Sequence, residues 1–201
     1  MRMITARTDQ VNGPANRHNE WVIQVSGLTV EVGGRNVVAG ASFTVRAGDK
    51  VGLVGRNGAG KTSLFRVLGG ENPAAAGSVS IKGALGYLSQ DPRVEAESQY
   101  TTALTHVLGG RGIADAMLRL EKLRIAVEED PSDRNISRFS RAEELFRHEG
   151  GYSAESEVRG LCHGLGLSAD RVDLPIGVLS GGERRRVELA RILFALSLIH
   201  I

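Results

Sequence analysis

One segment limits this chain more than any other: Gly55-Arg56-Asn57-Gly58-Ala59-Gly60-Lys61-Thr62. It matches the phosphate-loop pattern G-x-x-x-x-G-K-[ST] at every defined position. Glycines let the backbone of such a loop turn so that successive N–H groups point inward, toward phosphate oxygens. The apolar run at 50–54 predicts a buried strand before the loop, and residues 63–68 predict a helix after it. The segment therefore predicts a strand–loop–helix unit that binds a nucleoside triphosphate.

The loop also assigns chemistry to its last two residues. The Lys61 ammonium is expected to reach the β- and γ-phosphates as a point charge, and the Thr62 hydroxyl to ligate Mg²⁺. The N-terminus of the following helix adds further N–H donors. The alternative is a chance match in a glycine-rich chain, and the flanking strand and helix argue against it.

Composition excludes several classes of protein. A chain of 201 residues suits one domain, or one domain with an insertion, and a net charge of +2 gives no strong imbalance that points to nucleic acid. A local basic patch for ribosomal RNA stays open, because net charge hides it. Cys162 is the only cysteine, which excludes a disulfide within the chain, fits the cytoplasm and predicts a small buried apolar residue. The sequence contains no run of 18 apolar residues, so it predicts no membrane-spanning helix.

The pattern along the chain divides it into parts. Residues 1–20 are polar and read as a disordered lead-in, or as sequence upstream of a start at Met3. Strands are expected at 21–32, 37–38, 42–45, 79–81 and 85–88, so residues 21–93 read as a nucleotide-binding core. From residue 94 the apolar spacing becomes helical, with breaks at 131–133 and 150–151, and 94–178 reads as a helical subdomain. The charges on its first two helices indicate a solvated face or an arm that touches a large partner.

A second motif lies far downstream, at Leu179-Ser180-Gly181-Gly182-Glu183. Ser180 and Glu183 have the spacing of a capping box, so one interpretation is an ordinary capped helix. Gly181 and Gly182 are poor choices for a first helical turn unless another group must approach the backbone closely. A phosphate fits that need, because a helix N-terminus attracts anions.

Together these motifs resemble an ATP-binding cassette, and more narrowly the first cassette of the ABC-F proteins, which are soluble twin-cassette ATPases that act on ribosomes. The resemblance covers residues 21–195. It rests on the phosphate loop, on Tyr87-Leu88-Ser89-Gln90-Asp91-Pro92, on Gly150-Gly151-Tyr152-Ser153-Ala154-Glu155 and on the signature segment at 179–195. It implies an α/β fold: an ABC-type P-loop ATPase core with an antiparallel β subdomain and an inserted α-helical subdomain or arm. The stretch 91–178 is long for a transporter cassette and suits such an arm.

The resemblance implies a role for each motif residue. The nucleotide-binding residues would be Gly55, Arg56, Asn57, Gly58, Ala59, Gly60, Lys61, Thr62, Ser63 and Gln90. Gln90 would sense the γ-phosphate and, with Thr62, would hold Mg²⁺. Ser63 would lie near the α-phosphate. The segment Leu179, Ser180, Gly181, Gly182 and Glu183 would close over ATP held by a second cassette. One departure is Val32, which occupies the place where such cassettes often stack an aromatic residue on adenine.

The end of the chain departs from the family pattern as well. An ABC-F cassette continues after Ala195 into an apolar strand with an aspartate and a catalytic glutamate, yet no acidic residue follows Glu188. The sequence Leu-Ser-Leu-Ile-His-Ile at 196–201 corresponds to codons that resemble a transposon end used in sequencing libraries. We therefore expect an adapter-derived tail, an incomplete cassette without its catalytic residues, and no turnover by this chain alone. A natural apolar terminus is the alternative.

Other functions remain as alternatives at this point. The ATP-binding subunit of an ABC membrane transporter would need a membrane-protein partner that docks near Gln90. A chromosome-type or repair ATPase of the same superfamily would need a coiled coil of hundreds of residues, which 91–178 does not supply. A non-enzymatic module that holds ATP without turnover is the third.

Overall fold

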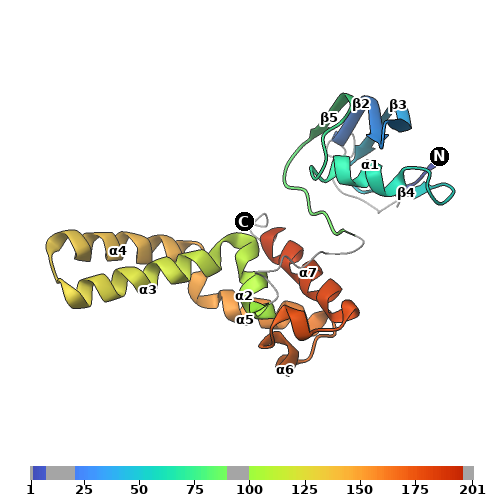
Figure 1. The fold of residues 1–201 in the computed structure, drawn as a ribbon. Helices are drawn as coiled ribbons and strands as arrows, with labels where there is room; N and C mark the ends of the chain where they lie inside the picture. Colours follow the sequence, from blue (N-terminus) through green and yellow to red (C-terminus); the bar gives the residue numbers. More distant parts are fainter. Residues whose placement is uncertain (1, 8–20, 90–99, 197–201) are drawn as a thin grey trace. The chain divides into compact units, whose positions relative to one another are not determined.

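The structure is a computed structural model that describes residues 2–7, 21–89 and 100–196. Two compact units divide the chain, Met1–Tyr87 and Leu88–Ile201, and each is described by itself. Figure 1 shows strands and one helix in the first unit and a set of helices in the second.

A three-stranded antiparallel sheet forms most of the first unit. Strands β2 (Trp21–Val32), β3 (Arg35–Arg46) and β5 (Ala76–Ile81) lie in the order β3-β2-β5. Gly33 and Gly34 make the tight β2–β3 turn with positive φ, a conformation that glycine adopts without a Cβ clash. The expected strand 21–32 is confirmed, whereas 37–38 and 42–45 belong to one continuous strand, because β3 pairs with β2 along nearly its whole length.

The phosphate-loop strand β4 (Asp49–Val54) and the helix α1 (Lys61–Leu68) complete this unit. β4 pairs antiparallel with β1 (Arg2–Arg7), so the expectation of a disordered lead-in is wrong for residues 2–7. This pairing joins segments far apart in the sequence, which local patterns do not reveal. One face of α1 packs on the sheet through a buried cluster of Val25, Leu28, Val30, Val38, Leu64 and Val67.

The strand expected at 85–88 is not formed. Residues 84–89 have no regular secondary structure, although β5 ends shortly before them. Tyr87 instead packs its ring against the end of α1, where a Cβ on Gly69 would stand 2.7 Å from the ring. Tyr87 thus contacts the end of α1 by side-chain packing and takes no part in strand pairing.

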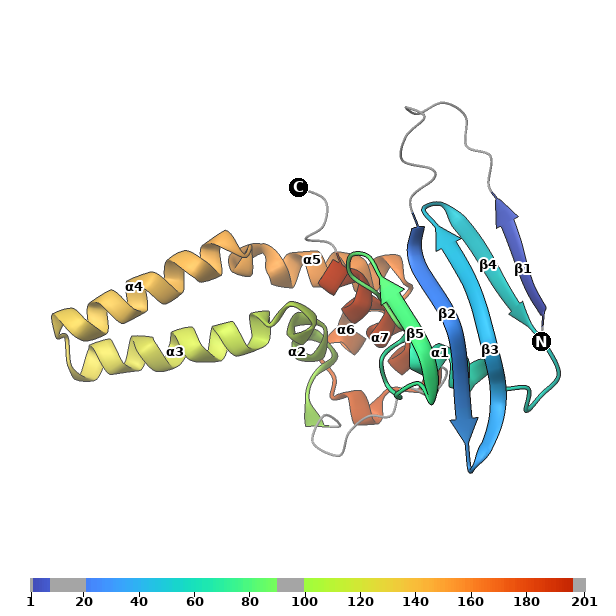
Figure 2. The same cartoon turned by 90° about the horizontal axis from the view of Figure 1, so that it is seen from above.

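The second unit is helical, as the apolar spacing predicts. Its elements are α2 (Ala103–Leu108), η2 (Gly109–Arg111), α3 (Ile113–Glu129), α4 (Asp133–His148), α5 (Gly151–Gly164), α6 (Ala169–Val172), η3 (Ile176–Val178) and α7 (Gly181–Leu196). Figures 1 and 2 both show α3 and α4 side by side as a long hairpin that projects from the other helices of the unit.

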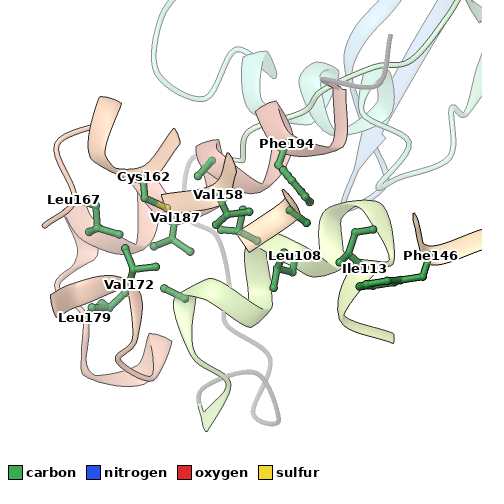
Figure 3. Close-up of a cluster of buried hydrophobic side chains, with 14 residues drawn as sticks. Leu108, Ile113, Phe146, Val158, Cys162, Leu167, Val172, Leu179, Val187 and Phe194 are labelled. Atoms are coloured by element: carbon green, nitrogen blue, oxygen red, sulfur yellow. The ribbon is translucent and has the colours of Figure 1, made fainter. Parts of the chain in front are cut away.

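The core of this unit lies where α2, α5 and α7 meet. Figure 3 shows its side chains, which include Leu108, Val158, Cys162, Val187 and Phe194. Cys162 is buried among them, as expected for a small apolar residue, and burial raises the pKa of its thiol. At the base of the hairpin, Phe146 packs edge to face on Tyr152 and directly above Gly151. No helix in the described part of the chain is both long enough and apolar enough to span a membrane.

Candidate nucleotide-binding site

The phosphate loop leaves the end of β4 and curls before α1 begins. Gly58 and Gly60 have φ of 79° and 83°, so the loop passes twice through the left-handed region. The Ala59 N–H donates to the Arg56 carbonyl at 3.2 Å and closes a turn within the loop. Alternation of right- and left-handed residues turns successive N–H groups toward one side, the geometry of an anion-binding nest. Gly55, Arg56, Asn57 and Gly58 are exposed, so a phosphate has access to the loop.

Gly60 is the residue at which the loop meets the sheet. It is buried, and a Cβ placed on it would stand 2.9 Å from Cβ and Cγ2 of Val37 on β3. Both the positive φ and this close approach therefore require glycine. The sequence motif predicted the glycine, but the contact with Val37 comes from tertiary packing.

The first turn of α1 fits an anionic ligand. Its N-cap is Gly60, which has no side chain to cap the helix, and no acidic residue lies in the first turn. The N-terminal N–H groups and the positive end of the helix dipole favour a phosphate at this position. Thr62 is exposed in the same turn and Ser63 is half-buried. Both hydroxyls therefore lie in the helical turn where the phosphate is predicted to bind. A hydroxyl oxygen beside phosphate oxygens is a donor set that suits Mg²⁺.

Lys61 bends back over the loop. Its Nζ donates to the Gly55 carbonyl at 2.7 Å and to the Arg56 carbonyl at 2.8 Å. These two carbonyls hold the ammonium over the same loop whose N–H groups are predicted to bind phosphate. A phosphate in the loop would offer the ammonium a stronger, charged acceptor.

The signature segment has the local structure expected of a capped helix. The Ser180 N–H donates to Glu183 Oε2 at 2.8 Å, and the Glu183 N–H donates to Ser180 Oγ at 3.3 Å. These reciprocal bonds confirm the capping box. Leu179 is buried and anchors the segment in the core. The backbone hydrogen bond from Ser180 is the main reason that the pKa of Glu183 lies below its ordinary value.

Two contacts around this cap were not evident from the sequence. Arg171 on α6 pairs with Glu183 Oε1 at 3.2 Å, and Arg184 donates to the Leu179 carbonyl at 3.0 Å. Arg171 lies on another helix, whereas Arg184 directly follows Glu183 and reaches back to the residue before Ser180. The only sequence signal for them was the richness of arginine near the motif.

Gly181 and Gly182 face open space. Both are exposed, neither has a positive φ, and a Cβ on either would meet no atom within 4 Å among the described residues. The fold of this part of the chain thus gives no internal reason for two glycines in the first turn of α7. An external group that approaches the helix N-terminus closely would supply one.

The remaining predicted residues have different outcomes. Gln90 lies outside the described residues. Val32 is 51% exposed at the end of β2, beside the Gly33–Gly34 turn. The phosphate loop belongs to the first unit and the signature segment to the second.

Comparison with known proteins shows which family carries these two segments. A model of the family described as "ABC transporter" matches residues 38–201. The chain is 32% identical over 176 residues to the tylosin resistance ATP-binding protein TlrC of Streptomyces fradiae, covering 84% of this chain and 31% of that protein. It is 30% identical over 180 residues to the energy-dependent translational throttle protein EttA of Haemophilus influenzae, covering 90% and 26%.

The name of a third relative describes a different role. The cytochrome c biogenesis ATP-binding export protein CcmA of Cupriavidus pinatubonensis is 34% identical over 171 residues, covering 85% of this chain and 64% of that protein. The chain thus spans less than two thirds of the length of each of these relatives.

Solved structures support the same fold. A bacterial Atm1-family ABC exporter with ATP bound aligns with a TM-score of 0.53 at 21% identity, covering 94% of this chain and 30% of that one. An ATP-binding cassette of an ABC transporter, MJ1267, aligns with a TM-score of 0.51 at 18% identity, covering 88% and 66%. The α/β fold expected of a P-loop ATPase core, with its antiparallel sheet and helical insertion, is therefore confirmed.

Proposed function

The chain belongs to the ABC transporter family of ATP-binding cassettes, and on that basis we propose that it is the first cassette of an ABC-F protein, a cytoplasmic twin-cassette ATPase that acts on the ribosome. Members of this family are nucleotide-binding ATPases whose cassettes work in pairs or with partners. The identity of the partner, the use of Mg²⁺ and the role of each site residue are part of the proposal.

In this account the phosphate loop holds ATP and the signature segment serves the ATP of a second cassette. Residues 55–62 supply N–H donors, Lys61 offsets charge on the β- and γ-phosphates, and Thr62 with Gln90 holds Mg²⁺. The first turn of α7 would approach the γ-phosphate in the facing cassette. The open surroundings of Gly181 and Gly182 are the observation that carries this step, because nothing within the described chain requires glycine at either position.

Pairing through ATP explains how binding becomes mechanical work. The phosphates of ATP carry up to four negative charges, which positive groups and N–H donors must offset. When one cassette supplies these groups from its phosphate loop and the other from its signature segment, ATP joins the two cassettes head to tail. Hydrolysis removes the γ-phosphate that links them, and the pair opens. In such a pair an acidic residue would orient the attacking water.

The helical hairpin supports the ABC-F assignment over a transporter subunit. α3 and α4 have 17 and 16 residues and project from the rest of their unit. The name of EttA links one relative to translation. The name of CcmA links another to export, and it supports the second candidate, an ATP-binding subunit that docks on a membrane protein.

Sedimentation of the complete natural protein with ribosomes tests this proposal. Loaded with a non-hydrolysable ATP analogue, the protein is expected to pellet with ribosomes, and a Lys61→Ala variant to stay in the supernatant. Binding to membrane vesicles from the same cells, with none to ribosomes, would favour the transporter subunit instead.

A further inference from the structure

The signature helix α7 is held against its unit at three levels. Near its N-terminus, Glu183 pairs with Arg171 on α6. In its middle, Glu188 Oε2 lies 3.0 Å from His106 Nε2 on α2, and Arg191 pairs with the same carboxylate. Near its C-terminus, the backbone carbonyl of Phe194 accepts a hydrogen bond from Arg111 on η2. The third level is the most buried of these contacts.

Arg111 makes three different contacts with one guanidinium. Its Nε donates to the Phe194 carbonyl at 2.7 Å, and its Cζ lies 3.5 Å from the centroid of the Phe194 ring. Its Nη2 pairs with Glu157 on α5. Only 5% of the Arg111 side chain is exposed. A planar, forked cation is the one side chain that can donate to a carbonyl, pair with a carboxylate and stack on a ring at once.

The backbone beside Arg111 is built for close approach to α7. A Cβ on Gly110 would stand 2.7 Å from the backbone carbonyl oxygen of Arg191, and Gly110 has no positive φ that would by itself demand glycine. The close approach is therefore the reason for glycine there. Gly110 brings η2 onto the last turns of α7 and so places Arg111 against Phe194.

Arg111 cannot act on a nucleotide by its charge. α7 has 16 residues, so its two ends are about 24 Å apart at 1.5 Å per residue. At that separation in water, one unit charge changes an equilibrium constant for another by less than about twofold, and salt screens it further. Any effect of Arg111 at the N-terminus of α7 must pass through the placement of the helix.

We propose that Arg111 is a positioning residue for the partner cassette's ATP: from η2 it fixes the axial position and tilt of α7, and so the place of Gly181 and Gly182. This inference rests on the proposed function, because it requires the first turn of α7 to meet a phosphate. A misplacement of about 1 Å can cost an enzyme about a hundredfold in rate, so a small shift of Gly181 and Gly182 is enough to weaken a phosphate contact. The contacts of Arg111 hold the helix at the end from which a small tilt moves the N-terminus most.

The test measures ATP-dependent association of two copies of this chain by analytical ultracentrifugation, and nucleotide affinity separately by titration with a fluorescent ATP analogue. Arg111→Met is expected to weaken association at least about tenfold while nucleotide affinity stays within twofold, because the phosphate loop is untouched. Arg111→Lys is expected to recover only part of the association, since lysine keeps the charge without the fork or the stack.

The matched control is Arg159→Met. Arg159 bridges two carboxylates, Glu155 and Asp173, but it is more exposed than Arg111 and neither of these partners lies on α7. Association equal to that of the unaltered chain is expected. Arg111→Met that associates as well as Arg159→Met would overturn the proposal, and so would full recovery in Arg111→Lys, which would indicate charge alone.

Two more variants keep the outcome decisive. If Arg111→Met does not fold, Gly110→Ala tests the same geometry with every Arg111 atom present, and unchanged association would overturn the proposal. Gly182→Asp places a carboxylate where the partner's phosphate is expected. If Gly182→Asp abolishes association and Arg111→Met does not, only the role of Arg111 fails. If Gly182→Asp associates normally, the proposed pairing itself fails.

Discussion

The ammonium of Lys61 donates to the backbone carbonyl of Gly55, 2.7 Å away across the phosphate loop. The side chain that should reach for phosphate is thus already folded over the loop and held by it. Nucleotide binding exchanges these neutral carbonyl acceptors for anionic phosphate oxygens, which attract the ammonium more strongly because both partners are then charged. The loop can therefore receive an anion with only a small movement of the Lys61 side chain.

Lys61→Ala is expected to raise the dissociation constant for ATP about 10- to 100-fold, because a hydrogen bond to a charged group contributes about 1.5–3 kcal/mol. Titration with a fluorescent ATP analogue measures this. Lys50→Ala, an exposed lysine on β4, serves as the control and should bind as the unaltered chain does. Equal affinity in Lys61→Ala would count against the phosphate-loop assignment.

Gly60→Ala is expected to destabilise the chain more than Gly58→Ala. Both residues have φ near 80°, which costs alanine about 1 kcal/mol, but only Gly60 also packs against Val37. Overpacking adds about 1–3 kcal/mol at Gly60. Urea unfolding of the two variants measures the difference. Equal free energies of unfolding would show that the contact with β3 does not constrain the loop.

Gly182→Asp is expected to abolish ATP-dependent association without lowering the free energy of unfolding. An aspartate in the first turn of a helix favours the helix by about 0.3–1 kcal/mol, so the free energy of unfolding should stay level or rise. The same carboxylate would repel the γ-phosphate of a partner's ATP, and ATP-dependent association should disappear. Gly160→Asp, at an exposed glycine on α5 with open surroundings, is the control and should associate normally. Loss of stability in Gly182→Asp would argue for an internal role of the glycine.

Glu188 is expected to make the free energy of unfolding depend on pH. Burial raises its pKa, but hydrogen bonds from His106 and Arg191 outweigh burial and lower the pKa from 4.5 to about 2. Because the folded-state pKa is depressed, the stabilisation is complete above pH 4.5 and is lost as pH falls toward 2. It amounts to about 1–3 kcal/mol, allowing for solvent screening. Urea unfolding at pH 6 and pH 3.5 should show a smaller loss in Glu188→Gln than in the exposed control Glu144→Gln. Identical losses would show that this pair does not contribute.

The sequence predicted the elements whose signals are local. The phosphate loop, the strand 21–32, the hairpin helices and the capping box of Ser180 and Glu183 follow from glycine placement, apolar periodicity and cap spacing. Such signals involve residues a few positions apart, which is why they can be found without a structure.

The misses are contacts between distant segments. β1 pairs with β4 across some 45 residues, and nothing within residues 2–7 indicates it. The short helix α2 was not singled out, although Thr102 caps it through the Thr105 N–H. Arg111 meets Glu157 and Phe194 only because three helical elements converge. These contacts depend on tertiary packing, which overrides or adds to local preference.

The most direct test of the account mixes two variants that are each defective in one half-site. Lys61→Ala keeps the signature segment and loses the phosphate loop, whereas Gly182→Asp keeps the loop and loses the signature. Analytical ultracentrifugation with ATP and Mg²⁺ should show that neither variant associates alone. An equimolar mixture should form pairs, because one complete ATP site is then restored. Association of Gly182→Asp by itself, or no association in the mixture while the unaltered chain pairs, would contradict the conclusion that the loop and the signature are halves of two different ATP sites.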